Sequence, residues 1–202
     1  MRYRSVCVAL FGLAMADARA AENFPAQDIW LQVETRTHLL TVMEGDKPIE
    51  RFEKIAIGRR GYGYEKERGD DKTPLGTYRI GWVNENSRYH RFYGFTYPNR
   101  ENAERAYQSG LIGPGAYQSI IQATADASVP PQDTPLGGQI GIHGLGSANP
   151  RVHQIFDWTH GCIAMTNEQI DRLSHWIRKG TLVVIREMSQ NKGGNLVDFT
   201  AN

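Results

Sequence analysis

The chain has 202 residues, with 23 lysines and arginines against 22 aspartates and glutamates, and a formal net charge of +1. This balance excludes the strongly basic surface that is typical of nucleic-acid-binding proteins, so no nucleic acid is expected as a partner. The length is enough for one domain with a sizeable core.

Residues 1–20 are predicted to be a signal peptide. Two arginines precede a short apolar run at 6–16, and Ala18-Arg19-Ala20 has the small-x-small pattern that a signal peptidase cleaves. The run is much shorter than the roughly 20 residues of a membrane-spanning helix, so an uncleaved anchor is the weaker alternative. We therefore expect a mature protein that begins at Ala21, is located in the periplasm and has no transmembrane anchor.

The segment 21–188 is predicted to be one mainly β domain, followed by a polar tail at 189–202. Strands are expected at 28–35 and 38–45, where apolar and β-branched residues flank a short turn. Further strands are expected within 49–58 and 77–83, in a short buried segment that ends at His143, and at 181–187. The sequence has no repeat of the length found in solenoids or propellers.

The segment 84–135 differs from the rest of the domain. It carries many aromatic residues among asparagine, serine, arginine, glycine and proline, and it has no clean periodicity. We interpret it as a long irregular excursion, which either packs on the core through its aromatic side chains or forms a lid or groove wall. His90 and the aromatic residues between Tyr89 and Tyr97 are candidates for a substrate groove and are left out of the catalytic set.

One helix is predicted directly after the segment "THGCIAM". Thr166 and Gln169 have the spacing of a capping box, which satisfies free backbone amides at a helix start. Ile170, Leu173 and Ile177 follow at helical spacing, and the Lys179-Gly180 pair is a suitable stop.

Cys162 is expected to be the only cysteine of the mature protein, because Cys7 lies within the predicted signal peptide. A single thiol cannot form an internal disulfide, and in an oxidising compartment it is exposed to oxidation. Such a thiol is either a small buried hydrophobe or a reactive group, and its neighbours distinguish these two interpretations.

The neighbours of Cys162 favour a nucleophile. A thiol attacks as its thiolate and needs a base or a positive charge nearby. His160 lies two residues before Cys162, and His143 lies at the end of a predicted strand, so either ring could serve as the base. Gly161 has no Cβ and lets backbone amides approach a substrate carbonyl. A nucleophile, a base and backbone donors are the minimum set for acyl transfer.

A metal site is the competing interpretation of the same side chains. His143, His153, His160 and Cys162 are ligand types that suit zinc. Their spacing matches none of the usual short-range zinc patterns, and no second cysteine supports them. No metal and no cofactor is therefore expected.

The segments "IHG" and "THGCIAMTN" resemble the signature of the YkuD-type L,D-transpeptidase catalytic domain family. In that family a histidine precedes a Ser/Thr-His-Gly-Cys motif, and here Thr159 lies sixteen positions after His143. The segment "DDKTPLGTYRI" is similar to the family's Thr-Pro-x-Gly-aromatic motif. The resemblance covers most of residues 29–187 and implies a β-sandwich-like fold.

The resemblance also implies an activity and assigns roles. It implies a periplasmic enzyme that acts on peptidoglycan stem peptides, both as donor and as acceptor. Cys162 would be the nucleophile and His143 the general base, with its ring oriented by the backbone carbonyl of Gly144. The loop and its oxyanion-binding amides would be formed by Thr159, His160 and Gly161. Attack by the thiol would release a terminal D-residue and leave a thioester, which an amine of another stem or a water molecule resolves.

One position departs from the family pattern. Many members have an arginine two residues after the cysteine, where this chain has Ala164. The resemblance implies that this arginine helps to hold the site or an anionic substrate group, so its absence leaves the specificity open. The candidates for a replacement charge are Arg59, Arg60, Arg88 and Arg91. In the loop before the cysteine, Asp157 is expected to be a solvated carboxylate rather than a histidine partner.

Two alternative functions remain at this stage. The first is hydrolysis at the same site, by an L,D-endopeptidase or carboxypeptidase, or by an amidase that cuts cross-links or protein–peptidoglycan links. A wall-attached protein is then a further candidate partner. The second is a catalytically silent protein that binds peptidoglycan. The thiol is expected to be reactive only if the site is catalytic.

Overall fold

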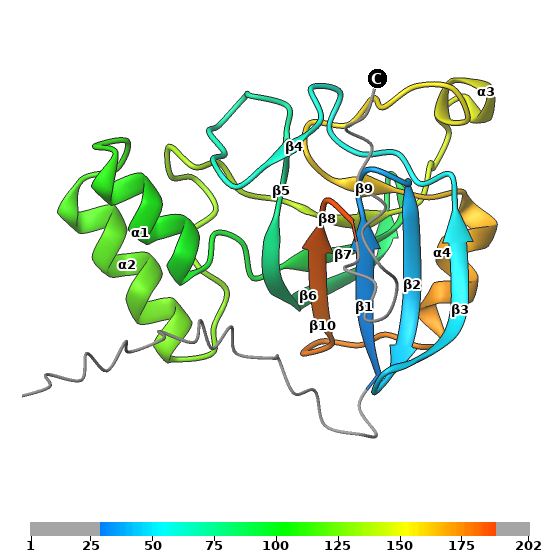
Figure 1. Ribbon diagram of the computed structural model, residues 1–202, viewed down its shortest axis with the longest axis horizontal. Helices are drawn as coiled ribbons and strands as arrows, with labels where there is room; N and C mark the ends of the chain where they lie inside the picture. Colours follow the sequence, from blue (N-terminus) through cyan, green and yellow to red (C-terminus); the bar gives the residue numbers. More distant parts are fainter. Residues whose placement is uncertain (1–28, 189–202) are drawn as a thin grey trace, which may run out of the picture.

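The computed structural model describes residues 29–188 (Figure 1). The predicted signal peptide at 1–20 and the predicted tail at 189–202 lie outside these residues, and the domain boundaries remain predictions. None of the helices within 29–188 has the length and apolar character needed to span a bilayer.

Eight strands form one sheet, in the order β3-β2-β1-β10-β6-β7-β8-β9. A separate two-stranded sheet pairs β4 with β5. The strand bounds are β1 Ile29–Glu34, β2 Leu39–Glu44, β3 Lys47–Glu53, β4 Tyr62–Gly63, β5 Thr73–Pro74, β6 Gly76–Ser87, β7 His90–Phe95, β8 Gly141–His143, β9 Ile163–Ala164 and β10 Leu182–Arg186. Four helices accompany them: α1 Arg100–Gln108, α2 Pro114–Ala125, α3 Pro150–His153 and α4 Asn167–Ser174.

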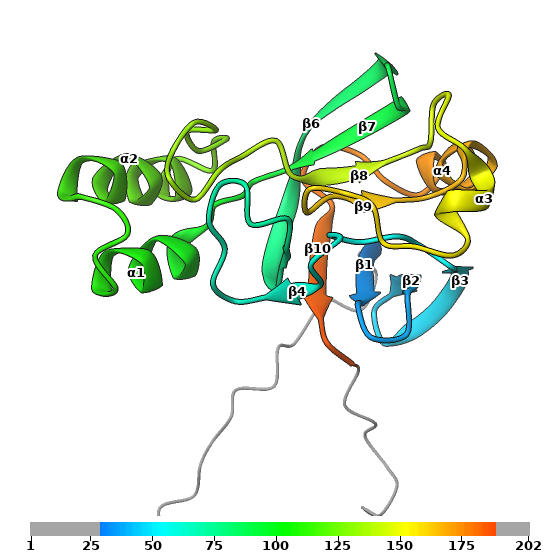
Figure 2. The same ribbon diagram turned by 90° about the horizontal axis from the view of Figure 1, so that it is seen from above.

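The long strand β6 belongs to both halves of the eight-stranded sheet. Residues 76–79 pair with β10, whereas residues from Ile80 onward pair with β7. Figure 2 shows β8 and β9 crossing over β1 and β10 instead of continuing in their plane. The sheet thus folds over itself into two layers, in agreement with the predicted mainly β, sandwich-like fold.

Apolar side chains from both layers form one core. Leu31 and Val33 alternate with less buried residues in β1 and are fully buried, as are Ile142 in β8 and Ile163 in β9. Burying such a side chain contributes about 1.5–3 kcal/mol relative to leaving it exposed. The alternation that predicted these strands is therefore also what joins the two layers.

The helix after the cysteine segment is present as predicted. Thr166 is the N-cap of α4, and Gln169 completes the capping box. Ile170 and Leu173 are fully buried, and α4 packs beside β7. The helix ends at Ser174, before the predicted stop at Lys179-Gly180.

The segment 84–135 is mostly regular and not the irregular excursion that its sequence predicts. It contains the end of β6, the whole of β7, and helices α1 and α2. The polar end of β6 has no apolar alternation because the β6–β7 hairpin projects beyond the sheet (Figure 2). The two helices lie against each other to one side of the sheet (Figure 1), and α2 buries only Ile120 fully. An apolar stripe this sparse gives almost no helical signal.

Candidate active site

Strands β8 and β9 place His143 and Cys162 on the same face of the sheet. The two strands are parallel, with Ile142 beside Ile163 and His143 beside Ala164. Continued by one residue, this register sets Cys162 beside Gly141, two residues before His143. Because side chains two residues apart along a strand point to the same face, the thiol and the imidazole are diagonal neighbours.

The His143 ring is enclosed by aromatic side chains. Tyr89, at the tip of the β6–β7 hairpin, stacks on it with ring centroids 4.3 Å apart. Phe92 stacks at 6.1 Å, and the Trp158 ring approaches edge-on at 5.8 Å. His143 is only 3% exposed, and this burial lowers its pKa to about 4. The imidazole is therefore neutral at pH 7.

A backbone contact determines which ring nitrogen of His143 holds the proton. Nδ1 lies 2.7 Å from the carbonyl oxygen of Gly144. A carbonyl oxygen only accepts, so Nδ1 donates and Nε2 keeps its lone pair. Gly144 itself is closely surrounded, since a Cβ there would lie 2.8 Å from both Asn167 Oδ1 and the Tyr89 carbonyl oxygen. This crowding holds the carbonyl in place.

The four-residue loop before β9 is closed by Thr159. Its hydroxyl donates to the carbonyl oxygen of Cys162 at 2.6 Å and accepts from the amide of Gly161 at 3.1 Å. Its own amide donates to the carbonyl of Ile57, which ties the loop to the segment after β3. The Gly161 amide is thus already occupied, whereas the Cys162 amide has no hydrogen-bond partner among residues 29–188.

Gly161 adopts a conformation that other residues avoid. Its φ is +124°, and a Cβ there would lie 2.5 Å from the Lys72 carbonyl oxygen. We expect Gly161→Ala to lower the free energy of unfolding by about 2 kcal/mol and to slow any reaction of Cys162 at least about tenfold, because the loop must shift. Chemical denaturation and thiol labelling measure the two effects.

Gly115 provides a matched control for that substitution. It lies in the first turn of α2, its φ is negative, and a Cβ there would meet nothing within 4 Å. Gly115→Ala should leave both the stability and the thiol reactivity close to those of the unmodified protein. Equal effects of the two substitutions would contradict the assigned strain.

The Cys162 thiol lies in a mixed environment. The residue is partly exposed, and Sγ donates to the carbonyl oxygen of Gln139 at 3.4 Å. Burial of the sulfur raises the pKa of the thiol to about 11, although the amide of Gly141 and the charge of Lys66 act in the opposite direction. The resting pair at pH 7 is therefore a neutral thiol and a neutral imidazole.

His160, the second candidate base, makes contacts that do not suit a base. His160 has a largely exposed side chain, and its Nδ1 lies 2.6 Å from Asp71 Oδ1. Arg59 binds the other oxygen of the same carboxylate, and the contacts from His160 and Arg59 lower the pKa of Asp71. His160 therefore fastens the loop to the segment before β5. No local pattern predicts this contact, because Asp71 lies 89 residues before His160.

The expectation for Asp157 is wrong, since this carboxylate is a histidine partner. Its oxygens lie 3.0 and 3.2 Å from His38 Nε2, and one of them accepts from the amide of Ile57 at 2.9 Å. His38 lies 119 residues earlier, beyond the reach of any local pattern. The pair ties the loop after α3 to the turn between β1 and β2.

His153 is buried and is bonded to the Trp158 side chain. Its Nδ1 accepts from Trp158 Nε1 at 3.3 Å, and its Nε2 is buried without a partner in the described part of the chain. Residues 29–188 contain no group of three or more histidine, cysteine, aspartate or glutamate side chains arranged to hold a metal ion. The four candidate zinc ligands therefore do not come together as a metal site.

The predicted replacements for the arginine missing at Ala164 contact other groups, except Arg60, which is exposed and has no ion pair among residues 29–188. Ala164 is fully buried and hydrogen-bonds through its backbone to Ala56. Among the predicted replacements, Arg59 is paired with Asp71, and Arg91 is paired with Glu85 and Asp171. Arg88 covers the outer face of the Tyr89 ring at 4.7 Å. The cation whose charge lowers the pKa of the Cys162 thiol is instead Lys66, which the sequence analysis did not single out.

We expect the Tyr89 ring to keep His143 neutral. In Tyr89→Leu the imidazole loses its closest stacking partner and gains solvent, so its pKa should rise from about 4 toward the ordinary value of 6.5. Tyr89→Phe keeps the ring and should leave the pKa unchanged. An NMR titration of the His143 ring protons measures both. Tyr107→Leu, which removes an exposed ring stacked on Tyr117, is the control.

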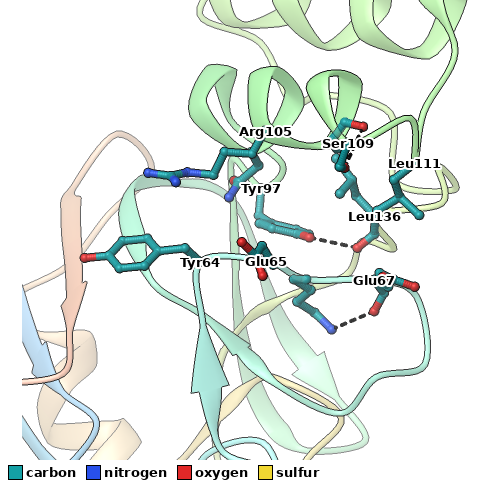
Figure 3. Close-up of a pocket in the computed structure, with 11 residues that line it drawn as sticks. Tyr64, Glu65, Glu67, Tyr97, Arg105, Ser109, Leu111 and Leu136 are labelled. Carbon is teal, nitrogen blue, oxygen red and sulfur yellow. Dashed lines mark hydrogen bonds between the residues drawn. The ribbon is translucent and has the colours of Figure 1, made fainter.

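A cavity of about 180 Å³ lies beside α1 and includes neither His143 nor Cys162. Figure 3 shows it between α1 and the segment 64–67, with Tyr64 and Arg105 at one end and Leu111 and Leu136 at the other. The Tyr97 hydroxyl donates to the Leu136 carbonyl at 2.7 Å along its wall. The cavity shares Lys66 with the surroundings of the thiol.

Comparisons with known proteins agree with this architecture. A family model described as the L,D-transpeptidase catalytic domain, YkuD, matches residues 28–185. The helical cell shape determining protein Pgp2 of Campylobacter jejuni is similar over 81% of this chain and 49% of its own, with 22% identity and a TM-score of 0.55. Bd1075 of Bdellovibrio bacteriovorus is similar over 80% and 48%, with 19% identity and a TM-score of 0.52.

The two structural matches are limited in coverage and in sequence identity. The chain spans about half the length of the two solved proteins, and at these identities the likeness shows the fold alone. A search of curated proteins found no match. The family model, in contrast, covers most of the chain and includes both His143 and Cys162. The chain therefore belongs to the L,D-transpeptidase catalytic domain family, as its two sequence motifs predicted.

Proposed function

We propose that the protein is a cysteine-dependent L,D-transpeptidase that acts on peptidoglycan stem peptides. The observation that carries the proposal is the placement of Cys162 and His143 as diagonal neighbours on one sheet face, with the His143 proton directed to Gly144. A neutral imidazole whose Nε2 is free can accept the proton of a thiol beside it. Membership of the family supports the substrate class.

The proposed reaction begins from the neutral pair. Cys162 Sγ attacks the carbonyl carbon of an L-centre linked to a D-residue, while the thiol proton moves to His143 Nε2. The resulting imidazolium gives this proton to the nitrogen of the scissile bond as that bond breaks, and the D-residue leaves as an amine. A thioester remains on Cys162. An amine of a second stem, or a water molecule, then attacks the thioester, and His143 again accepts a proton.

We assign the oxyanion donor to the amide of Cys162. The Gly161 amide donates to Thr159, so it contributes by holding the loop and not by binding the oxyanion. The Cys162 amide is free in the described part of the chain, as the role requires. In this proposal Thr159, His160 and Gly161 are positioning residues, and Gly144 orients the base.

The geometry of the site does not distinguish an amine acceptor from water. Hydrolysis of cross-links or of protein–peptidoglycan links would use the same two steps, with water in place of the amine, and a wall-attached protein would then be a partner. The substrate class implies work in the periplasm, and the proposed signal peptide at 1–20 is the route there. Cleavage after Ala20 is tested by determining the N-terminal residue of the exported protein.

Mass spectrometry of reaction products tests the proposal. Purified protein is incubated with a disaccharide tetrapeptide and, separately, with a cross-linked dimer. Cross-linked or amino-acid-exchanged products that are absent with Cys162→Ala are the expected result. Shortened or separated stems that are likewise absent with Cys162→Ala would establish the hydrolase instead. If neither substrate changes, while both still bind, the protein is a silent binding protein and the proposal is wrong.

A further inference from the structure

A second cavity, of about 230 Å³, adjoins the loop that carries the thiol. One of its walls is His160, two residues before Cys162. Another is the segment 137–140, whose Gln139 carbonyl accepts the thiol proton at 3.4 Å. The cavity is therefore next to the proposed nucleophile. Its lining residues are Lys66, Arg68, Gly69, Gln132, Gly137, Gly138, Ile140 and His160.

Three of the lining residues are basic and none is acidic, although Lys66 and His160 are bound to the carboxylates of Asp70 and Asp71 outside the lining. Arg68 donates its Nε and Nη2 to the carbonyl oxygen of Thr134, at 3.1 and 2.9 Å, and has no carboxylate partner among residues 29–188. Its Nη1 remains available. A guanidinium that meets only a backbone carbonyl keeps its full charge, and it presents donors in the fixed geometry that suits a carboxylate.

Lys66 supplies a second charge from a buried position. Its side chain is only 3% exposed, with Nζ 2.6 Å from Asp70 Oδ1 and 3.3 Å from the Glu67 carbonyl oxygen. An ammonium has three donors, so one remains. The stem of the same side chain passes the catalytic loop, since a Cβ on Gly161 would lie 3.2 Å from Lys66 Cε. The pairing with Asp70 offsets the cost of burying this charge.

The rest of the cavity wall leaves space for a ligand to come close to the backbone. His160 is bound through Nδ1 to Asp71 and keeps Nε2 free. Three of the lining residues are glycines, which leave the backbone open to a ligand. An anionic group in this cavity would meet the guanidinium of Arg68 and the ammonium of Lys66, next to the loop that carries the thiol.

We infer that this cavity is a subsite for a carboxylate that lies within one residue of the bond cleaved by Cys162. The identity of the ligand as a stem peptide rests on the proposed function. Two carboxylates of a donor stem meet this description, that of the terminal D-residue and that on the side chain of diaminopimelate. Either one would be held by Arg68 and Lys66 and would fix the scissile carbonyl over Sγ.

Binding to the Cys162→Ala protein tests the subsite without turnover. Three synthetic donor peptides are compared by calorimetry: the tetrapeptide with both carboxylates, the same peptide with a C-terminal carboxamide, and one with lysine in place of diaminopimelate. We expect one of the two altered peptides to bind at least about tenfold more weakly than the first. The peptide that loses affinity identifies which carboxylate the cavity takes.

The Arg68→Gln substitution, combined with Cys162→Ala, assigns the effect to the cavity. It should abolish the difference in affinity, whereas Arg178→Gln should preserve it, because Arg178 is exposed between α4 and β10 and lines neither cavity. Equal affinities for all three peptides, or a difference that survives Arg68→Gln, would overturn the inference. Turnover by the Cys162 protein is scored separately, so the subsite can stand even if the proposed reaction fails.

Discussion

Cys162→Ser should lower the rate of acylation by on the order of a thousandfold or more while the fold is retained. Serine is nearly isosteric with cysteine, and the strands on both sides of the position are unchanged. A hydroxyl, however, is much harder to deprotonate than a thiol. The base proposed for the site is an imidazole whose pKa is about 4. A base this weak can assist a thiol but gives little help to an alcohol.

Two measurements made together establish the effect of this substitution. Intact-mass spectrometry after mixing with donor peptide should show a peptide adduct on the unmodified protein and none on Cys162→Ser. Calorimetry should show the same affinity of both proteins for the peptide, which separates lost chemistry from lost binding. An adduct that persists on the serine variant would place the nucleophile elsewhere.

His143→Ala should slow acylation by on the order of a thousandfold at pH 7, because a general base typically contributes 100- to 10,000-fold. Removal of the imidazole leaves a thiol with a pKa of about 11, which is almost wholly protonated at neutral pH. His175→Ala is the matched control, since it removes an exposed imidazole at the end of α4. That ring has no role in the proposed site, so the control should retain the activity.

The pH dependence distinguishes a base from a merely structural histidine. Since burial lowers the pKa of His143, the unmodified protein should keep a constant acylation rate from pH 8 down to 5 and lose it as the pH falls through about 4. In His143→Ala the residual rate should instead rise about tenfold per pH unit between 7 and 10, following the thiolate. Parallel profiles for the two proteins would exclude the base role. Circular dichroism at each pH confirms that the fold persists.

The sequence predicted those parts of the fold whose signal is local. Apolar residues alternate with polar ones in 29–34 and follow one another in 182–186. Both segments form strands with buried side chains. Thr166 and Gln169 predicted a helix start, because a capping box lies within four residues. The helices α1 and α2 were missed because they pack mainly against each other and only a few of their side chains reach the core.

In the candidate site, too, residues in local motifs could be predicted from the sequence, whereas contacts made by tertiary packing could not. Cys162 and His143 could be predicted as a catalytic pair because their motifs are compact and their separation along the chain is characteristic, and their roles remain a proposal. Tyr89 was predicted only as a candidate for the substrate groove, and the contacts of Lys66 and Asp71 were not predicted, because each residue reaches the site from a distant segment through tertiary packing. Asp157 was assigned to solvent for the same reason, since its partner His38 lies on a turn that no local pattern connects to it.

The position of β10 in the sheet has a consequence for the order of folding. The last described strand is inserted between β1 and β6, parallel to one and antiparallel to the other. Until residues 182–186 have been made, β1 and β6 each have an unpaired edge, and the sheet cannot close. Such long-range pairing also makes closure slow. A chain of this topology stays open until its final strand emerges, which suits a protein that we propose to cross a membrane before it folds.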